Sequence, residues 1–198
     1  MAQSISFSVL MTVFNKAEFV STAIESVLNQ THTNFELIIV DDHSTDESLD
    51  IARAFATRDK RIRLFSNVEN LGDYPNRNQA IKHSKNEYLK FLDADDEMRT
   101  NALEIFAKTI LQFDHENPGY YFTVHEPKIS GDIRSKYLTS RELYRREYIS
   151  NRRTFAAAPN SCLYRKSTIT KIGEFLPEAQ TGDFEMAHRT SSTYGAVL

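Results

Sequence analysis

The fold is decided by the stretch YLKFLDADD, Tyr88–Asp96. Its apolar, aromatic-rich first half is typical of a buried strand, and this run ends in three carboxylates within four residues. Carboxylates this close repel one another, and a divalent cation that prefers oxygen ligands removes the repulsion. A cation at a strand tip is suited to hold a diphosphate. Aspartates at a helix start, which accept from free backbone N–H groups, are the alternative.

The composition predicts one soluble globular domain, with 198 residues, 40% hydrophobic content and 26% charged content. A net charge of −3 gives no global attraction to nucleic acid. The single cysteine, Cys162, has no partner for an internal disulfide or a zinc site. Neither a leader pattern nor a run of ~20 apolar residues is present, so we expect a cytoplasmic protein.

Strand and helix patterns alternate along the chain, which predicts an α/β fold, a Rossmann-like and mainly parallel sheet with helices on both faces. Apolar runs predict strands at Ile5–Phe14, Phe35–Val40, Ile62–Phe65, Tyr88–Leu92 and Tyr120–Val124. Helical periodicity predicts helices at Phe19–Leu28, Glu47–Ala56, Arg77–Ser84 and Ala102–Leu111. The second of these helices carries a capping-box signature, Ser44 with Glu47.

Two acidic clusters, Asp41-Asp42 and Asp93–Asp96, fall where predicted strands end. In open α/β sheets, ligands bind beyond the carboxyl ends of the strands. Two acidic tips at one rim therefore favour a nucleotide and metal site over simple helix capping. The glycine-rich loops GxGxxG and GxxxxGK[ST] are absent from the sequence, which argues against a dinucleotide dehydrogenase or a P-loop enzyme.

Four stretches together resemble the family 2 glycosyltransferases of the GT-A fold, which transfer a sugar from a nucleotide diphosphate. They are Ser8–Asn15, Ser26–Thr31 running on to Val40–Asp46, Asn70–Gly72 with Arg77-Asn78, and Phe91–Asp96. The resemblance covers essentially the whole chain and is firmest up to about residue 115. It implies one GT-A domain over residues 1–198, with a nucleotide-sugar-binding half, 1–115, and an acceptor-side half, 116–198, that is truncated at its C-terminus.

The resemblance also implies how the donor is held. Asp42 is expected to contact the base, by preference uracil, or its ribose. The turn that carries Thr12, Phe14 and Asn15 is expected to lie beside the base, and Arg77 to face the donor's phosphates or sugar. A turn acid at Asp42 and a solvated helix residue at Arg77 are the structural alternatives.

Asp93, Ala94 and Asp95 resemble the DxD motif of the family. The resemblance therefore implies a divalent cation, Mn²⁺ or Mg²⁺, with Asp95 as the main ligand and Asp93 as a further one. Asp96 is expected to share in contacts with the metal or the ribose.

A base is also needed, because the acceptor hydroxyl attacks the anomeric carbon well only if its proton is removed as the bond forms. Asp183 lies where similar enzymes carry the Asp of a Glu-Asp pair, and the resemblance implies that it is the base of an inverting transfer. Gly182 stands in place of the Glu, so half of the motif is present. Capping of the helix that follows is the alternative role for Asp183.

Residues 128–153 carry eight basic and three acidic side chains. A solvated basic helix, steering of an anionic donor, and peripheral contact with the inner face of a membrane that holds a lipid-linked saccharide acceptor are all compatible with this excess. Tyr144 and Tyr148 are expected either to stack on a sugar or to pack together on a helix.

Three positions depart from the family pattern: Thr12 replaces a proline, His43 a glycine and Gly182 a glutamate. Two rival functions stay open. The half motif at Asp183 favours a nucleotide-sugar-binding subunit without catalysis. A haloacid-dehalogenase-type phosphatase also places Asp-x-Asp after a strand, but a Thr or Val normally follows where this chain has Asp96.

Overall fold

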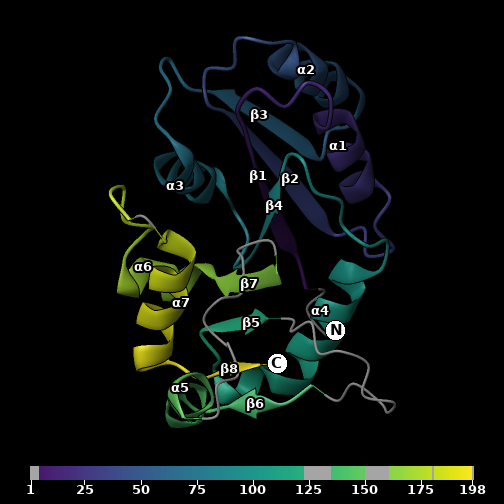
Figure 1. Ribbon diagram of the computed structural model, residues 1–198. Helices are drawn as coiled ribbons and strands as arrows, with labels where there is room; N and C mark the ends of the chain where they lie inside the picture. Colours follow the sequence, from purple (N-terminus) through teal and green to yellow (C-terminus); the bar gives the residue numbers. More distant parts are fainter. Residues whose placement is uncertain (1–4, 123–134, 150–160, 180, 198) are drawn as a thin grey trace.

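The structure is a computed structural model that describes residues 5–122, 135–149, 161–179 and 181–197. In these ranges one mixed sheet has the strand order β3-β2-β1-β4-β7-β5-β8-β6 (Figure 1). The strands are β1 Phe7–Val13, β2 Phe35–Asp41, β3 Ile62–Ser66, β4 Tyr88–Asp93, β5 Tyr120–Phe122, β6 Tyr137–Leu138, β7 Cys162–Arg165 and β8 Ala196–Val197. The helices are α1 Val20–Leu28, α2 Ser48–Arg58, α3 Asp73–His83, α4 Ala102–Phe113, the 3-10 turn η1 Asp114–Glu116, α5 Ser140–Tyr148, α6 Lys166–Ile172 and α7 Gly182–Thr193.

The first four strands are parallel, with β1 between β2 and β4 and β3 outside β2. The remaining strands change direction, because β7 pairs antiparallel to both β4 and β5, and β6 antiparallel to β8. The predicted α/β class with a Rossmann-like sheet is confirmed, and its parallel part is concentrated in the first 93 residues. The carboxyl ends of β1, β2 and β4 therefore meet at one edge of the sheet.

Helices cover both faces of this sheet, and each face has its own apolar core (Figure 1). Side chains of α1, α2 and α4 pack on one face together with Val9 and Met11 of β1. Side chains of α3, α5, α6 and α7 pack on the other face, which receives Leu10 of β1. Val9, Leu10 and Met11 of β1 thus point to alternate faces and are all buried, as expected for a parallel strand covered on both sides. Each such side chain contributes about 1.5–3 kcal/mol through burial.

Two local predictions are wrong. Helix α3 begins at Asp73, four residues before the predicted start, because Pro75 lies in the first turn, where backbone N–H groups have no intrahelical partner. The predicted capping box is not formed, since the N-cap of α2 is Glu47 without a side-chain cap hydrogen bond. Ser44 instead accepts a hydrogen bond from the Asn15 N–H at 3.0 Å.

The described part of the fifth predicted strand ends at Phe122, and Val124 lies outside the described residues. Among the helices that the structure describes, none combines the length and the apolar character needed to cross a membrane.

Candidate functional site

The site is built around the carboxyl end of β1. Val13 pairs with Asp41 on β2, and Thr12 pairs with Asp93 on β4. The two acidic strand ends therefore lie on either side of β1. Two strand spacings separate them, a distance of about 10 Å. Ala94 is buried directly after β4, so its side chain anchors the start of the turn that follows.

Arg77 lies inside this acidic edge. Its side chain is only 6% exposed, and it donates from Nη2 to Asp93 Oδ1 at 2.7 Å and from Nε to Asp73 Oδ1 at 2.9 Å. Burial opposes its charge, but the carboxylates of Asp93 and Asp73 outweigh burial and raise the pKa of Arg77. The guanidinium also lies 5.8 Å from the centre of the Phe91 ring. The alternative of a solvated helix residue is therefore wrong for Arg77.

Arg77→Met is expected to lower the free energy of unfolding by about 2–3 kcal/mol, because Asp93 loses the cation that compensates its partly buried charge. Arg77→Lys keeps the positive charge but cannot bind Asp73 and Asp93 with two separate N–H groups of a planar guanidinium, and it should lose less stability than the Met variant. Urea denaturation of both variants measures the effect. A Met variant as stable as the parent protein would contradict the assigned pairing.

Asp183 is the carboxylate that α7 brings to the same place. Its Oδ1 is buried and has no hydrogen-bond partner among the described residues. Burial raises the pKa of Asp183 to about 6, an effect that Arg77 opposes and that Asp73 and Asp93 increase. The capping alternative is wrong, because α7 begins at Gly182 with Thr181 as its N-cap. A half-buried carboxylate with a raised pKa, and with one oxygen that no described residue engages, is suited to accept a proton.

Gly182, which stands where similar enzymes carry a glutamate, packs against the side chain of Tyr74. The Gly182 N–H donates to the Tyr74 hydroxyl at 2.8 Å, and a Cβ on Gly182 would lie 2.5 Å from Cζ of the Tyr74 ring. The ring of Tyr74 thus occupies the space next to residue 182. No sequence pattern indicated this contact between residues 108 positions apart.

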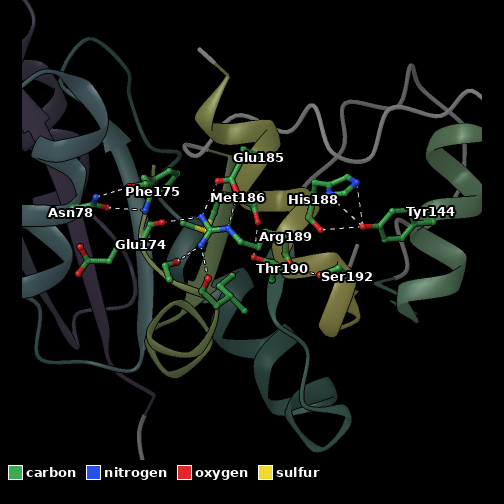
Figure 2. Close-up of polar contacts among 12 residues, drawn as sticks. Asn78, Tyr144, Glu174, Phe175, Glu185, Met186, His188, Arg189, Thr190 and Ser192 are labelled. Carbon is green, nitrogen blue, oxygen red and sulfur yellow. Dashed lines mark hydrogen bonds and ion pairs between the residues drawn. The ribbon is translucent and has the colours of Figure 1, made fainter. Parts of the chain in front are cut away.

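Helix α7 is fixed to its surroundings by Arg189 (Figure 2). The Arg189 guanidinium binds both carboxylate oxygens of Glu185, at 2.7 and 2.8 Å, and the backbone carbonyls at the end of α6, residues 172–174. The next residue, Phe175, exchanges two hydrogen bonds with Asn78 of α3, at 2.8 and 3.0 Å. These contacts connect the helix that carries Asp183 to the helix that carries Arg77.

Asp42 holds the loop that leads into α3. Its Oδ1 accepts from Asn67 Nδ2 at 2.7 Å and from the Leu71 N–H at 2.9 Å, and its Oδ2 accepts from the Gly72 N–H at 2.9 Å. Asp42 is buried and both of its carboxylate oxygens hold this loop, so its observed contacts are structural and its contact with the donor stays a prediction. The neighbouring Asp41 is also buried, and its Oδ1 has no partner among the described residues, a feature that sequence reasoning did not single out.

The turn after β1 packs on the turn after β2. Asn15 has a φ of +52° and accepts through Oδ1 from the Thr45 N–H at 2.8 Å. His43 has a φ of +63°, in the left-handed region that glycine adopts at least cost, which accounts for glycine being common there in the family. Thr12 is half-buried and Phe14 is 45% exposed at the same edge.

Two carboxylates of the DxD region have basic partners. Asp93 pairs with Arg77, and Asp95 pairs with Lys16 at 2.5 Å. Within the described ranges no three His, Cys, Asp or Glu side chains are grouped so as to hold a metal ion. The expected metal set of Asp93, Asp95 and Asp96 stays a prediction, in which a cation would have to compete with Arg77 for Asp93 and with Lys16 for Asp95. A cation here would need oxygen ligands from outside the protein, as Mg²⁺ commonly takes from phosphates.

The basic segment 128–153 is described only for residues 135–149, which include α5. Tyr144 and Tyr148 stack on each other along this helix, with ring centres 6.0 Å apart. The packing alternative for these two tyrosines is thus confirmed. Tyr144 also contacts His188 of α7 (Figure 2).

Comparison with known proteins identifies the family. Residues 8–173 match the profile described as glycosyl transferase family 2. The chain belongs to this family. An uncharacterized glycosyltransferase of Rickettsia bellii is 36% identical over 142 residues, 66% of this chain and 20% of that protein. Glycosyltransferase GlyG of Streptococcus pneumoniae is 33% identical over 107 residues, 54% of this chain and 36% of that protein.

Solved structures of glycosyltransferases share the fold of this family 2 chain. The structure of Staphylococcus aureus TarS 1–349 in complex with UDP has a TM-score of 0.74 at 20% identity, covering 98% of this chain and 57% of that one. Mannosyltransferase PcManGT from Pyrobaculum calidifontis, in complex with GDP-Man and Mn²⁺, has a TM-score of 0.76 at 17% identity, covering 98% and 55%. The chain thus spans little more than half of these proteins and about a fifth to a third of the two relatives above. The GT-A fold is confirmed.

Proposed function

We propose that this chain is an inverting glycosyltransferase domain that moves a sugar from a nucleotide diphosphate, by preference UDP, to a hydroxyl of a saccharide or lipid-linked saccharide. The observation that carries the proposal is Asp183, whose half-buried carboxylate has one oxygen without a partner in the described part of the chain and lies near the Arg77–Asp93 ion pair. The family membership and the carboxyl-end position of Asp93 support the same reaction class.

In the proposed reaction Asp183 acts as the general base. Its Oδ1 takes the proton of the acceptor hydroxyl while the acceptor oxygen bonds to the anomeric carbon and the bond to the leaving diphosphate breaks. Attack opposite the leaving group inverts the configuration, so one carboxylate base is sufficient. The raised pKa of about 6 makes Asp183 a better proton acceptor than an ordinary Asp, and it is still ionised at neutral pH.

The donor is proposed to lie across the carboxyl ends of β2, β1 and β4. Asp42 would contact the base or ribose, with Thr12, Phe14 and Asn15 beside it. TarS and PcManGT, which share the fold, are described with UDP, UDP-GlcNAc or GDP-Man, and this supports a nucleotide-sugar donor.

A divalent cation, Mn²⁺ or Mg²⁺, is proposed to accompany the donor. Acids outnumber bases at this edge, with Asp73, Asp93, Asp95, Asp96 and Asp183 against Arg77 and Lys16. A dianionic diphosphate alone would be repelled here, whereas a cation would neutralise it and polarise the leaving group. Asp95 would be the main protein ligand, since its partner Lys16 is an exposed, flexible side chain, and Asp93 and Asp96 flank it.

The test is a thermal-shift panel of nucleotide sugars with and without Mn²⁺, followed by transfer assays with the donors that bind. We expect uridine donors to raise the unfolding temperature, and Mn²⁺ to increase that shift. Binding without transfer or donor hydrolysis would instead support a non-catalytic subunit. An absence of binding by every nucleotide sugar, or phosphatase activity on small phosphoesters, would overturn the proposal.

A further inference from the structure

Tyr74 connects the two chain segments that form the proposed site. It lies in the first turn of α3, three residues before Arg77, and its hydroxyl accepts a hydrogen bond from the Gly182 N–H at 2.8 Å. The same hydroxyl is close enough to the Asp183 carboxylate to favour its ionised form. The phenol therefore contacts the backbone at the start of α7, one residue before Asp183.

The ring of Tyr74 is held in this position from two sides. On one side it stacks on Phe175, with ring centres 5.6 Å apart and planes 14° from parallel. On the other side it fills the space beside Gly182, where an added Cβ would approach ring atoms to 2.5–2.8 Å. Phe175 is itself fixed by its two hydrogen bonds to Asn78. The hydroxyl is thus placed by packing and has little freedom to swing away from Asp183.

The charged surroundings of Asp183 explain why this contact matters. Asp73 and Asp93 disfavour its ionised form, and so does burial, whereas Arg77 and Tyr74 favour it. The other titratable groups that face it, Cys162 and Tyr164 of β7, are buried, and burial raises the pKa of both. Arg77 is already bound to two other carboxylates. Of the two groups that favour the ionised form, Tyr74 is the one without a charge.

We propose that Tyr74 is a positioning residue for the reaction: its hydroxyl, bonded to the Gly182 N–H, fixes the first turn of α7 and so orients the Asp183 carboxylate toward the acceptor's proton. This inference rests on the function proposed above. Gly182 is part of the arrangement, because a side chain at that position would displace the ring.

Tyr74→Phe removes the hydroxyl and keeps the ring. We expect kcat to fall about tenfold with little change in the KM of the donor, since a hydrogen bond to a charged group is lost while the donor contacts remain. The acid limb of the pH–rate profile should move to higher pH, because the hydroxyl lowers the pKa of Asp183. Tyr144→Phe is the matched control, since it removes a hydroxyl that contacts α7 at His188; its kcat and pH profile should stay unchanged.

Two measurements separate this inference from the proposed function. An NMR titration of the Asp183 carboxyl needs no turnover, and in Tyr74→Phe its pKa should rise. If no acceptor is glycosylated, the proposed function fails, and an unmoved titration would overturn the Tyr74 contact as well. If transfer occurs, equal kcat and equal pH profiles for Tyr74→Phe and the parent protein would overturn the inference alone.

The steric part is tested by a thermodynamic cycle on Tyr74 and Gly182 that follows thermal unfolding. Gly182→Ala should lower the unfolding temperature clearly in the parent protein and much less in a Tyr74→Ala background, because the ring that the new methyl group meets is gone. Equal losses in both backgrounds would show that the ring does not occupy this space, which would remove the physical basis of the inference.

Discussion

Asp183→Asn is expected to lower kcat/KM for sugar transfer by about 10²–10⁴-fold, the usual contribution of a positioned general base. Asn has nearly the same shape as Asp but cannot accept the proton of the acceptor hydroxyl. In the parent protein, kcat/KM should rise with pH until Asp183 is ionised, near its pKa of about 6, and then level off. The residual activity of the Asn variant should lack this rise.

The same substitution should leave the protein folded and make it more stable at neutral pH. A carboxyl whose pKa is raised by folding binds more protons in the folded state, so stability falls as the pH rises from about 4 to about 6. Asn removes this loss, and the difference should vanish in more acidic solution. Glu178→Gln, at an exposed position before α7, is the matched control and should change neither rate nor stability. Near-normal turnover of Asp183→Asn would remove Asp183 from its assigned role.

Asp95→Asn is expected to lower the transfer rate by at least about a hundredfold, because the cation would lose its main protein ligand and the leaving diphosphate its charge stabilisation. The Lys16 ammonium holds the pKa of Asp95 below its usual range, so the carboxylate is ionised over the whole working pH range. Loss of an exposed ion pair costs little, and the variant should therefore unfold within about 1 kcal/mol of the parent protein.

Rates measured against Mn²⁺ concentration provide the decisive comparison for Asp95. The parent protein should saturate with the metal, whereas the Asn variant should need much more of it or fail to respond. Asp50→Asn is a suitable control, because Asp50 also forms an exposed ion pair, with Arg53, but lies on α2. An unchanged Mn²⁺ response in Asp95→Asn would contradict its role as a ligand.

The central strands could be predicted because they are apolar on both faces, and because β2 and β4 end in acidic residues. Burial on both sides leaves a continuous hydrophobic run, and this signal is local to β1, β2 and β4. The start of α3 was missed because Pro75 is typical of a loop, although proline is tolerated in the first turn of a helix. Likewise, Ser44 has the spacing of a capping residue, but a tertiary contact with Asn15 uses its hydroxyl.

The candidate site was predicted in its residue types more than in its pairings. Asp93, Asp95 and Asp183 follow from the resemblance, yet their partners depend on side chains that are distant in the sequence. Arg77 could have faced solvent, and its burial between Asp73 and Asp93 becomes visible only when α3 packs on the sheet. The contact of Tyr74 with Gly182 similarly requires the fold, because neither residue carries a recognisable signal by itself.

The antiparallel pairing of β7 on β4 makes the two halves of the chain inseparable. Strand β4 has β1 on one side, and residues 163–165 complete its other side. Leu89 and Phe91 of β4 are both fully buried. Cutting the chain near residue 115 would turn β4 into an unpaired edge strand, which is prone to self-association. Separating the two halves would therefore break the β4–β7 pairing, and an exchange of the second half would have to keep residues 162–165 in place.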